Sequence, residues 1–207
     1  GPVTSAVARL QNKNLDMNWL YFGAGRYFFE IPPEGASTTP DIDDADGQRR
    51  LFGIKDPCFI GGTINPATCV SASSTSSVAF STLTDVTNIG SVPAEGIANL
   101  PGFKGWYISL DPSANYIYDN AATRAFRAER VITDPLATTS GVVFFTTYKP
   151  YADECALGGK SFVWALRYNT GGAPSTAVMK GKVLVQVSTA SVEQLDLATA
   201  FRGDAAL

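Results

Sequence analysis

The sequence predicts an all-β protein made of short antiparallel strands. Runs rich in β-branched and aromatic residues recur along the chain, and proline, glycine or asparagine stops each run, which is typical of strands joined by turns. Apolar residues make up 45% of the 207 residues and charged residues 17%, a composition that favours a folded module over a disordered segment. Helix is expected to be minor, with short helices at 120–129 and 191–201.

The second half of the chain carries the clearest strand pattern. Four strands are predicted there in succession, at 131–135, 141–148, 161–168 and 182–188. The third of these alternates around Trp164 and Leu166 and ends in the turn Asn-Thr-Gly-Gly at 169–172. Because four antiparallel strands cannot bury both faces of their sheet, we expect this unit, residues 127–188, to stack on another sheet as a blade of a β-propeller does.

The first half of the chain, residues 4–111, is predicted to form a related unit. Its four strands are expected at 6–10, 18–29, 49–54 and 105–110. The stretch 56–104 separates the last two strands and is rich in Ser, Thr, Gly and Pro, so we interpret it as an insertion. Connections of this length are usually functional loops or have structure of their own. A shorter insertion is expected at 150–160, and residues 189–207 form a C-terminal segment.

The predicted organisation is a single β-propeller fragment over residues 1–207. It contains about two four-stranded antiparallel blades with long loop insertions. Two blades do not close a propeller, since closure typically takes about four to eight. Open edge strands expose unpaired backbone groups. We therefore expect other parts of the same protein, or a second polypeptide, to complete the propeller.

Five segments follow one another in an informative order: WLYFGAGRYF at 19–28, RLFGIKDPC at 50–58, GWYISLD at 105–111, ERVITDP at 129–135 and VSTASVEQL at 187–195. In this order they resemble the C-terminal β-propeller of type IV pilus tip adhesins and assembly proteins of the PilY/PilC type. The family's propeller is much longer than this chain. Its F-G-T-G-R run reads Phe22-Gly23-Ala24-Gly25-Arg26 here, and no complete calcium loop is present.

This resemblance implies a non-catalytic module located outside the cell or on the outer cell surface, at the tip of a type IV pilus. Its function would be to support pilus assembly and surface adhesion, with minor pilins among its partners. The alternative is a fragment of a quinoprotein-type propeller dehydrogenase, because ALRYNTGG at 165–172 resembles that family's A-L-D-x-x-T-G signature. The chain has neither a C-x-x-C-H haem motif nor the adjacent cysteine pair that lies over the quinone in that family.

The absence of histidine limits the chemistry that this chain can perform. Without imidazole there is no Ser-His-Asp triad, no Cys-His pair and no His-ligated zinc or haem. A net charge of -3 gives no electrostatic footprint for nucleic acid or an anionic membrane. No apolar run approaches the roughly 20 residues of a transmembrane helix. Histidine-dependent catalysis is therefore excluded, while carboxylate chemistry as in glycosidases stays open because Asp and Glu total 19. The prediction that the chain is not an enzyme rests on the resemblance. The charge and the hydropathy predict no nucleic-acid partner and no transmembrane segment.

The three cysteines fit an oxidising compartment better than a metal site, because their spacing matches no zinc motif. Cys58 and Cys69 flank a short loop that contains glycine and proline, and we predict that they form a disulfide. A bridge closing this loop stabilises by about 2–3 kcal/mol on the chain-entropy estimate. Cys155 is then either a buried free thiol or the partner of a cysteine elsewhere in the longer protein.

A cluster of carboxylates between the second and third predicted strands is the candidate metal site. It consists of Asp41, Asp43, Asp44 and Asp46, followed by Gly47. Alternating carboxylates before a glycine are typical of calcium loops, so Ca²⁺ is the candidate ligand. The register differs from that of an EF-hand, because Gly47 as the sixth residue puts Ile42 first and Gly53 twelfth. The alternative interpretation is a solvated acidic turn.

Glycine and tryptophan residues point mainly to packing. The glycines of the run at 22–26 precede a continuing β pattern rather than a helix, so we expect them to permit close packing of strands, not phosphate binding. Trp19, Trp106 and Trp164 each lie within an apolar strand, and we expect them to pack between blades. The alternative is an exposed aromatic platform for a sugar or a host surface.

Overall fold

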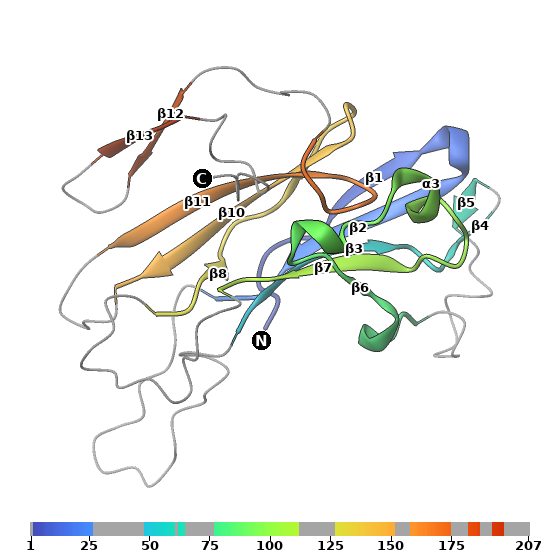
Figure 1. Ribbon diagram of the computed structural model, residues 1–207, viewed down its shortest axis with the longest axis horizontal. Helices are drawn as coiled ribbons and strands as arrows, with labels where there is room; N and C mark the ends of the chain where they lie inside the picture. The colour runs from blue at the N-terminus through green and yellow to red at the C-terminus, as the bar shows by residue number, and fades with distance from the viewer. Residues whose placement is uncertain are drawn as a thin grey trace, which may run out of the picture.

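The computed structural model describes residues 2–26, 48–60, 62–64, 77–111, 127–151 and 158–174, together with the backbone of two strands at 182–186 and 192–196. In this part of the chain the structure is mostly β-sheet with a few short helical turns, which confirms the predicted all-β class. Two main sheets lie face to face and neither closes into a barrel (Figure 1).

The first unit forms a five-stranded sheet in the order β1-β2-β3-β7-β6. Its strands are β1 (Ala8–Asn12), β2 (Met17–Gly23), β3 (Arg50–Lys55), β6 (Thr84–Asp85) and β7 (Gly105–Ser109). Strands β1, β2, β3 and β7 correspond to the four predicted strands of the unit, and neighbouring strands among them pair antiparallel. The short β6 comes from the insertion and pairs parallel to β7.

The turn between β1 and β2 is built by side-chain capping. Asn12 accepts hydrogen bonds at Oδ1 from the backbone N–H groups of Asn14 and Leu15, over the 3₁₀ turn η1 (Lys13–Leu15). Asp16 then takes a left-handed conformation, with φ of 47°, which starts β2 in the opposite direction.

The second sheet is centred on a long hairpin. It contains β8 (Arg130–Val131), β9 (Leu136–Ala137), β10 (Val142–Pro150) and β11 (Gly159–Arg167). Strand β10 pairs antiparallel with β11 along its whole length, and with β8 and β9 on its other edge. Strands β10 and β11 correspond to the strands expected at 141–148 and 161–168. The strand expected at 131–135 is wrong over most of its length, because only Val131 belongs to β8 and the next strand, β9, begins after Pro135, which has no N–H to donate.

The fourth expected strand has a different partner. Strand β12 (Lys182–Gln186) pairs with β13 (Val192–Asp196) in a separate two-stranded sheet, and not with β11. The expected helix at 191–201 is wrong where the structure describes it. A single short helix forms few hydrogen bonds of its own, whereas pairing along the Val-rich β12 satisfies the backbone of both segments. Residues 127–129, at the end of the other expected helix, are also not helical.

The insertion at 56–104 has structure of its own, as expected for a connection of this length. Besides β6, its described residues form a small hairpin and three helical turns. These are β4 (Phe59–Ile60), β5 (Thr63–Ile64), η2 (Phe80–Thr82), η3 (Ile89–Ser91) and α3 (Glu95–Ala98). No helix in the described ranges is both long and apolar enough to cross a bilayer.

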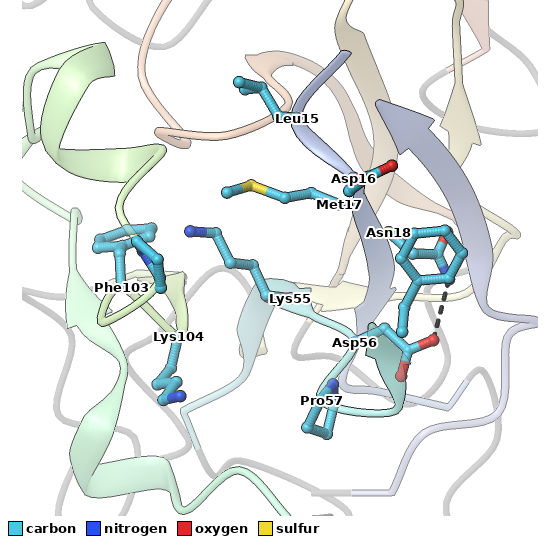
Figure 2. Close-up of a pocket in the computed structure, with 11 residues that line it drawn as sticks. Leu15, Asp16, Met17, Asn18, Lys55, Asp56, Pro57, Phe103 and Lys104 are labelled. Atoms are coloured by element: carbon cyan, nitrogen blue, oxygen red, sulfur yellow. Dashed lines mark hydrogen bonds between the residues drawn. The ribbon is translucent and has the colours of Figure 1, made fainter. Parts of the chain in front are cut away.

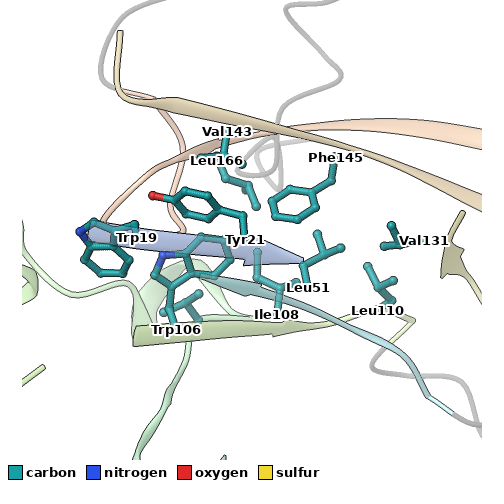
Figure 3. Close-up of a cluster of buried hydrophobic side chains, with 11 residues drawn as sticks. Trp19, Tyr21, Leu51, Trp106, Ile108, Leu110, Val131, Val143, Phe145 and Leu166 are labelled. Carbon is teal, nitrogen blue, oxygen red and sulfur yellow. The ribbon is translucent and has the colours of Figure 1, made fainter. Parts of the chain in front are cut away.

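The hydrophobic core lies between the two main sheets. From the five-stranded sheet, Trp19, Tyr21 and Trp106 are completely buried. Figure 3 shows Val143, Phe145 and Leu166 pointing toward these rings from β10 and β11. Trp106 meets Phe145 edge to face at 6.5 Å between ring centroids. Trp19 and Trp106, which were expected to pack between blades, are buried between the two main sheets.

The glycines at 22–26 allow the sheets to approach closely. A Cβ on Gly23 would lie 2.2 Å from Cγ2 of Val131, and one on Gly25 would lie 2.7 Å from the Val131 carbonyl oxygen. The backbone N–H of Val131 donates to the carbonyl of Ala24 at 3.1 Å. Close packing of backbone, as predicted from the sequence, is thus the role of these glycines.

The turn at 169–172 is buried rather than exposed. The carbonyl of Tyr168 accepts hydrogen bonds from the Tyr21 hydroxyl and from Trp106 Nε1, both at 3.1 Å. Asn169, which is 0% exposed, donates from Nδ2 to Oδ1 of Asn99 at 3.0 Å. This turn therefore fastens the second sheet to both the first sheet and the insertion.

Candidate functional site

The face of the five-stranded sheet that points away from the core carries a second group of aromatic side chains. Strand register sets Phe22 beside Phe52, and Phe52 beside Tyr107, across three neighbouring strands. Phe80, from η2 in the insertion, completes the group. We call these four residues the outer aromatic face. Ring centroids lie 5.0 Å apart for Phe22 and Phe52 and 4.8 Å apart for Phe80 and Tyr107.

Charged groups border the outer aromatic face. The guanidinium carbon of Arg50 lies 5.0 Å from the Phe80 ring centroid and 5.7 Å from that of Tyr107, which is within the range of cation–π attraction. Desolvation raises the pKa of Tyr107, and the hydrogen-bonded carboxylate of Asp85 raises it further, while Arg50 opposes both. Phe80 is 49% exposed, so this face presents an aromatic surface with one cationic and one anionic edge.

A cavity of about 490 Å³ opens where β2 and β3 meet the turn that precedes β7 (Figure 2). We call it the Lys55 cavity. Its described walls combine apolar side chains with two lysines, two aspartates and an asparagine. They are Leu15, Asp16, Met17, Asn18, Lys55, Asp56, Pro57, Phe59, Pro101, Phe103 and Lys104.

Lys55 is the central cation of this cavity. Its Nζ donates to the carbonyl of Leu100 at 2.7 Å and lies 5.5 Å from the Trp19 ring centroid and 5.4 Å from that of Phe103. Burial, followed by the nearby charge of Lys104, lowers the pKa of Lys55 from 10.5 to about 8. Both causes disfavour the ammonium form of Lys55. An anion placed in the cavity would favour that form, because opposite charges attract.

Asn18 and Asp56 form the polar wall opposite Lys55. Asn18 Nδ2 donates to Asp56 Oδ2 at 2.9 Å, and Asp56 Oδ1 accepts from the backbone N–H of Cys58 at 2.9 Å. A carboxylate only accepts, so the nitrogen of the Asn18 amide must face Asp56. Asn18 Oδ1 is buried and has no hydrogen-bond partner among the described residues.

A buried carboxylate lies at the far end of the core. Glu129 accepts hydrogen bonds at Oε1 from Thr147 Oγ1 and from Trp164 Nε1, the latter at 3.1 Å. Burial is the main cause that raises the pKa of Glu129, and the charge of Asp111 adds to it. Asp111 in turn accepts from Lys149 Nζ at 2.5 Å and from the backbone N–H of Glu129 at 2.8 Å.

The residues selected from the sequence have different outcomes. Asp41, Asp43, Asp44 and Asp46 lie outside the described residues, so the calcium site stays a prediction. Cys58 is disulfide-bonded. Both possible partners, Cys69 and Cys155, also lie outside the described residues, and the bridge between Cys58 and Cys69 stays a prediction. In the part of the chain that the structure describes, no group of three or more Cys, Asp or Glu side chains could hold a metal ion.

Sequence reasoning missed the three places described above. The outer aromatic face has a signal in the sequence, because aromatic residues occupy both phases of the alternation in β2 and β7. The Lys55 cavity has no such signal, and neither has the group of Glu129, Thr147 and Trp164, which we call the Glu129 cluster. Each brings together segments from distant parts of the chain. Trp164, expected to pack between blades, is only partly buried and uses its indole N–H in the Glu129 cluster.

Comparison with known proteins adds no relative. No protein-family model, no curated protein and no solved structure matches this chain.

Proposed function

We propose that this chain is a non-catalytic module of a type IV pilus tip protein that supports pilus assembly and surface adhesion. The ordered resemblance of five segments to that family is the starting point. Two stacked sheets, the first with four antiparallel strands in a meander and the short parallel β6 at its edge, agree with what that resemblance implies. The proposal places the module outside the cell, as part of a longer tip protein whose assembly involves minor pilins.

The outer aromatic face is the observation that carries this proposal. The inner face of the same sheet already stacks on a second sheet through Trp19, Tyr21 and Trp106. Its outer face presents Phe52 and Tyr107 beside the half-exposed Phe80 of η2, with no second sheet over them among the described residues. We therefore assign as its occupant a neighbouring sheet of the same tip protein, which would bury these rings as the inner face buries its own.

We do not extend the proposal to dehydrogenase activity. The residues at 165–172 that resemble the quinoprotein signature are used in packing, because Asn169 bonds to Asn99 and Gly171 lies against Trp106. Fold analogy alone does not supply an activity.

Complementation in the encoding bacterium tests the proposal. Deleting the gene should remove surface pili and attachment, and the wild-type gene should restore both. The double variant Phe52→Ser with Phe80→Ser should not restore them, because its outer face cannot bury against a neighbouring sheet. Phe162→Ser is the matched control, since Phe162 is 39% exposed on β11 of the other sheet.

Thermal unfolding of the purified variants separates loss of docking from loss of folding. Both variants should unfold within a few degrees of the wild type, because exposed substitutions usually change stability by about 0.5 kcal/mol or less. Normal piliation after gene deletion would contradict the proposed function. Full complementation by the double variant would contradict the assigned docking face.

A further inference from the structure

The Lys55 cavity has the size of a small-molecule site. At about 490 Å³ it falls within the range of roughly 300–1,000 Å³ that is common for ligand pockets. It lies at the end of the five-stranded sheet, where β2, β3 and the turn before β7 converge (Figure 2). The outer aromatic face uses none of its lining residues, so this inference goes beyond the proposed docking function.

The two lysines of the Lys55 cavity have hydrogen-bond donors available for a ligand. The Lys55 ammonium carries three donors, and within the described ranges one of them is used, by the Leu100 carbonyl. Lys104 lines the same cavity and its charge acts on Lys55. No carboxylate among the described residues forms an ion pair with either lysine. An anion with two oxygens, such as a carboxylate, can accept from Lys55 and gain a charge-assisted hydrogen bond.

The hydrogen-bond acceptors of the Lys55 cavity favour a ligand with hydroxyl groups. The Asp16 and Asp56 carboxylates both line the cavity. A carboxylate oxygen accepts hydrogen bonds, and hydroxyl groups on a ligand can donate to it.

Its apolar walls suit the ring of a sugar. Met17, Phe59 and Phe103 supply flat or adaptable apolar surface beside the polar groups. Figure 2 shows the side chain of Lys55 extending toward the side where Met17 and Phe103 lie. A pyranose carries hydroxyls at its edge and C–H groups on its face, and it therefore matches a site with this mixture of surfaces.

We propose that the Lys55 cavity binds a sugar acid, a monosaccharide unit that carries a carboxylate as in a uronic or sialic acid. The Lys55 ammonium donates a hydrogen bond to the carboxylate of the ligand, and Lys104 adds positive charge. Asp16 and Asp56 accept from ring hydroxyls, and Phe103 packs on the ring. The ligand reaches the site either as a free sugar acid or as the terminal unit of an acidic glycan on a surface.

Ligand-observed NMR and calorimetry on the purified chain test this assignment with four probes. These are glucuronic acid, N-acetylneuraminic acid, glucose and acetate. At least one of the two sugar acids should bind about tenfold or more tightly than either glucose or acetate, because only a sugar acid uses both the cation and the acceptors. A sialylated trisaccharide then distinguishes the two sources: a glycan-terminal unit binds as tightly as the free acid, whereas a site for free acids rejects it.

Variants connect the binding to the cavity. Lys55→Met should weaken binding of the sugar acid about tenfold or more, and Lys55→Arg should restore part of it. Lys160→Met, at an exposed position on β11, is the matched control and should bind as the wild type does. Thermal unfolding establishes that each variant is folded. No binding of either sugar acid, equal binding of glucose or acetate, or undiminished binding by folded Lys55→Met would each overturn the proposal.

Discussion

The two faces of the five-stranded sheet use the same kinds of residue in opposite surroundings. Along β7, Trp106 is 0% exposed on the inner face, while its neighbour Tyr107 lies on the outer face, only partly buried beside the half-exposed Phe80. Strand periodicity sorts the residues onto two faces but does not decide what covers each face. The second sheet covers the inner face. The comparison teaches that aromatic content alone does not distinguish a core from a docking surface.

Substitution of adjacent residues on β7 should give the largest contrast. Trp106→Ala should cost about 3–5 kcal/mol, because it leaves a cavity between the sheets and removes the hydrogen bond to the Tyr168 carbonyl. Tyr107→Ala should cost only about 1 kcal/mol, since the ring it removes is not fully buried. Chemical denaturation of both variants measures the two free energies of unfolding. Similar costs for the two variants would show that the outer face is already part of a core.

The next effect tests the turn that fastens the sheets together. Gly171 has φ of 68°, and a Cβ there would lie 2.6 Å from Cδ2 of Trp106. Gly171→Ala should therefore cost about 2–3 kcal/mol from backbone strain and overpacking together. Gly102→Ala is the control, because nothing lies within 4 Å of its added Cβ. A Gly171→Ala protein as stable as the Gly102→Ala protein would mean that this turn is loosely packed.

The buried Glu129 predicts that the stability of the fold depends on pH. Its pKa in the folded protein is raised above the ordinary value of 4.5, so the folded state binds the proton more tightly than the unfolded chain does. Stability should therefore be highest below pH 4.5 for this group and fall as the pH rises through the folded pKa. Glu129→Gln should lack this fall and at pH 7 should equal or exceed the wild type by about 1 kcal/mol.

Denaturation series at several pH values measure this difference between the two proteins. Thr147→Val, which removes one donor to the carboxylate, should steepen the fall with pH, because that hydrogen bond lowers the pKa of Glu129. A Glu129→Gln protein that keeps the wild-type pH profile would refute the assignment of the dependence to Glu129.

Lys55 should have the smallest effect on stability, and of opposite sign. Its folded pKa of about 8 lies below the ordinary 10.5, so the unfolded chain holds the extra proton between these values. Stability should rise over that pH range by on the order of 1 kcal/mol or less, since Lys55 is partly exposed. Lys104, Asp16 and Asp56 line the same cavity and remain unchanged in Lys55→Met, so the wild type minus this variant isolates Lys55. A flat difference between pH 8 and 10.5 would contradict the lowered pKa.

Strand patterns in the sequence predicted the two sheets more closely than the connections between them. The predicted strands at 49–54 and 105–110 differ from β3 and β7 by one residue at most at each end. Alternation marks these strands because one face of each is buried. The parallel β6 and the pairing of β12 with β13 depend on which backbone edges are open in the folded chain, which residue type does not reveal.

The candidate site was less predictable than the fold. Lys55 follows a strand pattern directly and has the sequence features of an ordinary surface lysine. Burial and the charge of Lys104 lower its pKa, and both act only after folding. Glu129 is similar, because Thr147 and Trp164 reach it from both strands of the later hairpin. Sites assembled from distant segments leave no local pattern for sequence analysis to find.

The buried turn at 169–172 has a consequence for the order of folding. The inner rings Tyr21 and Trp106 find their last hydrogen-bond acceptor only in the Tyr168 carbonyl, well over a hundred residues after β2 begins. During synthesis, which starts at the N-terminus, the aromatic inner face of the first sheet therefore stays exposed until the hairpin of β10 and β11 has been made. Contacts this far apart in sequence slow folding, since the connecting chain must close before they form. Newly made protein should thus pass through a stage that a holding chaperone recognises.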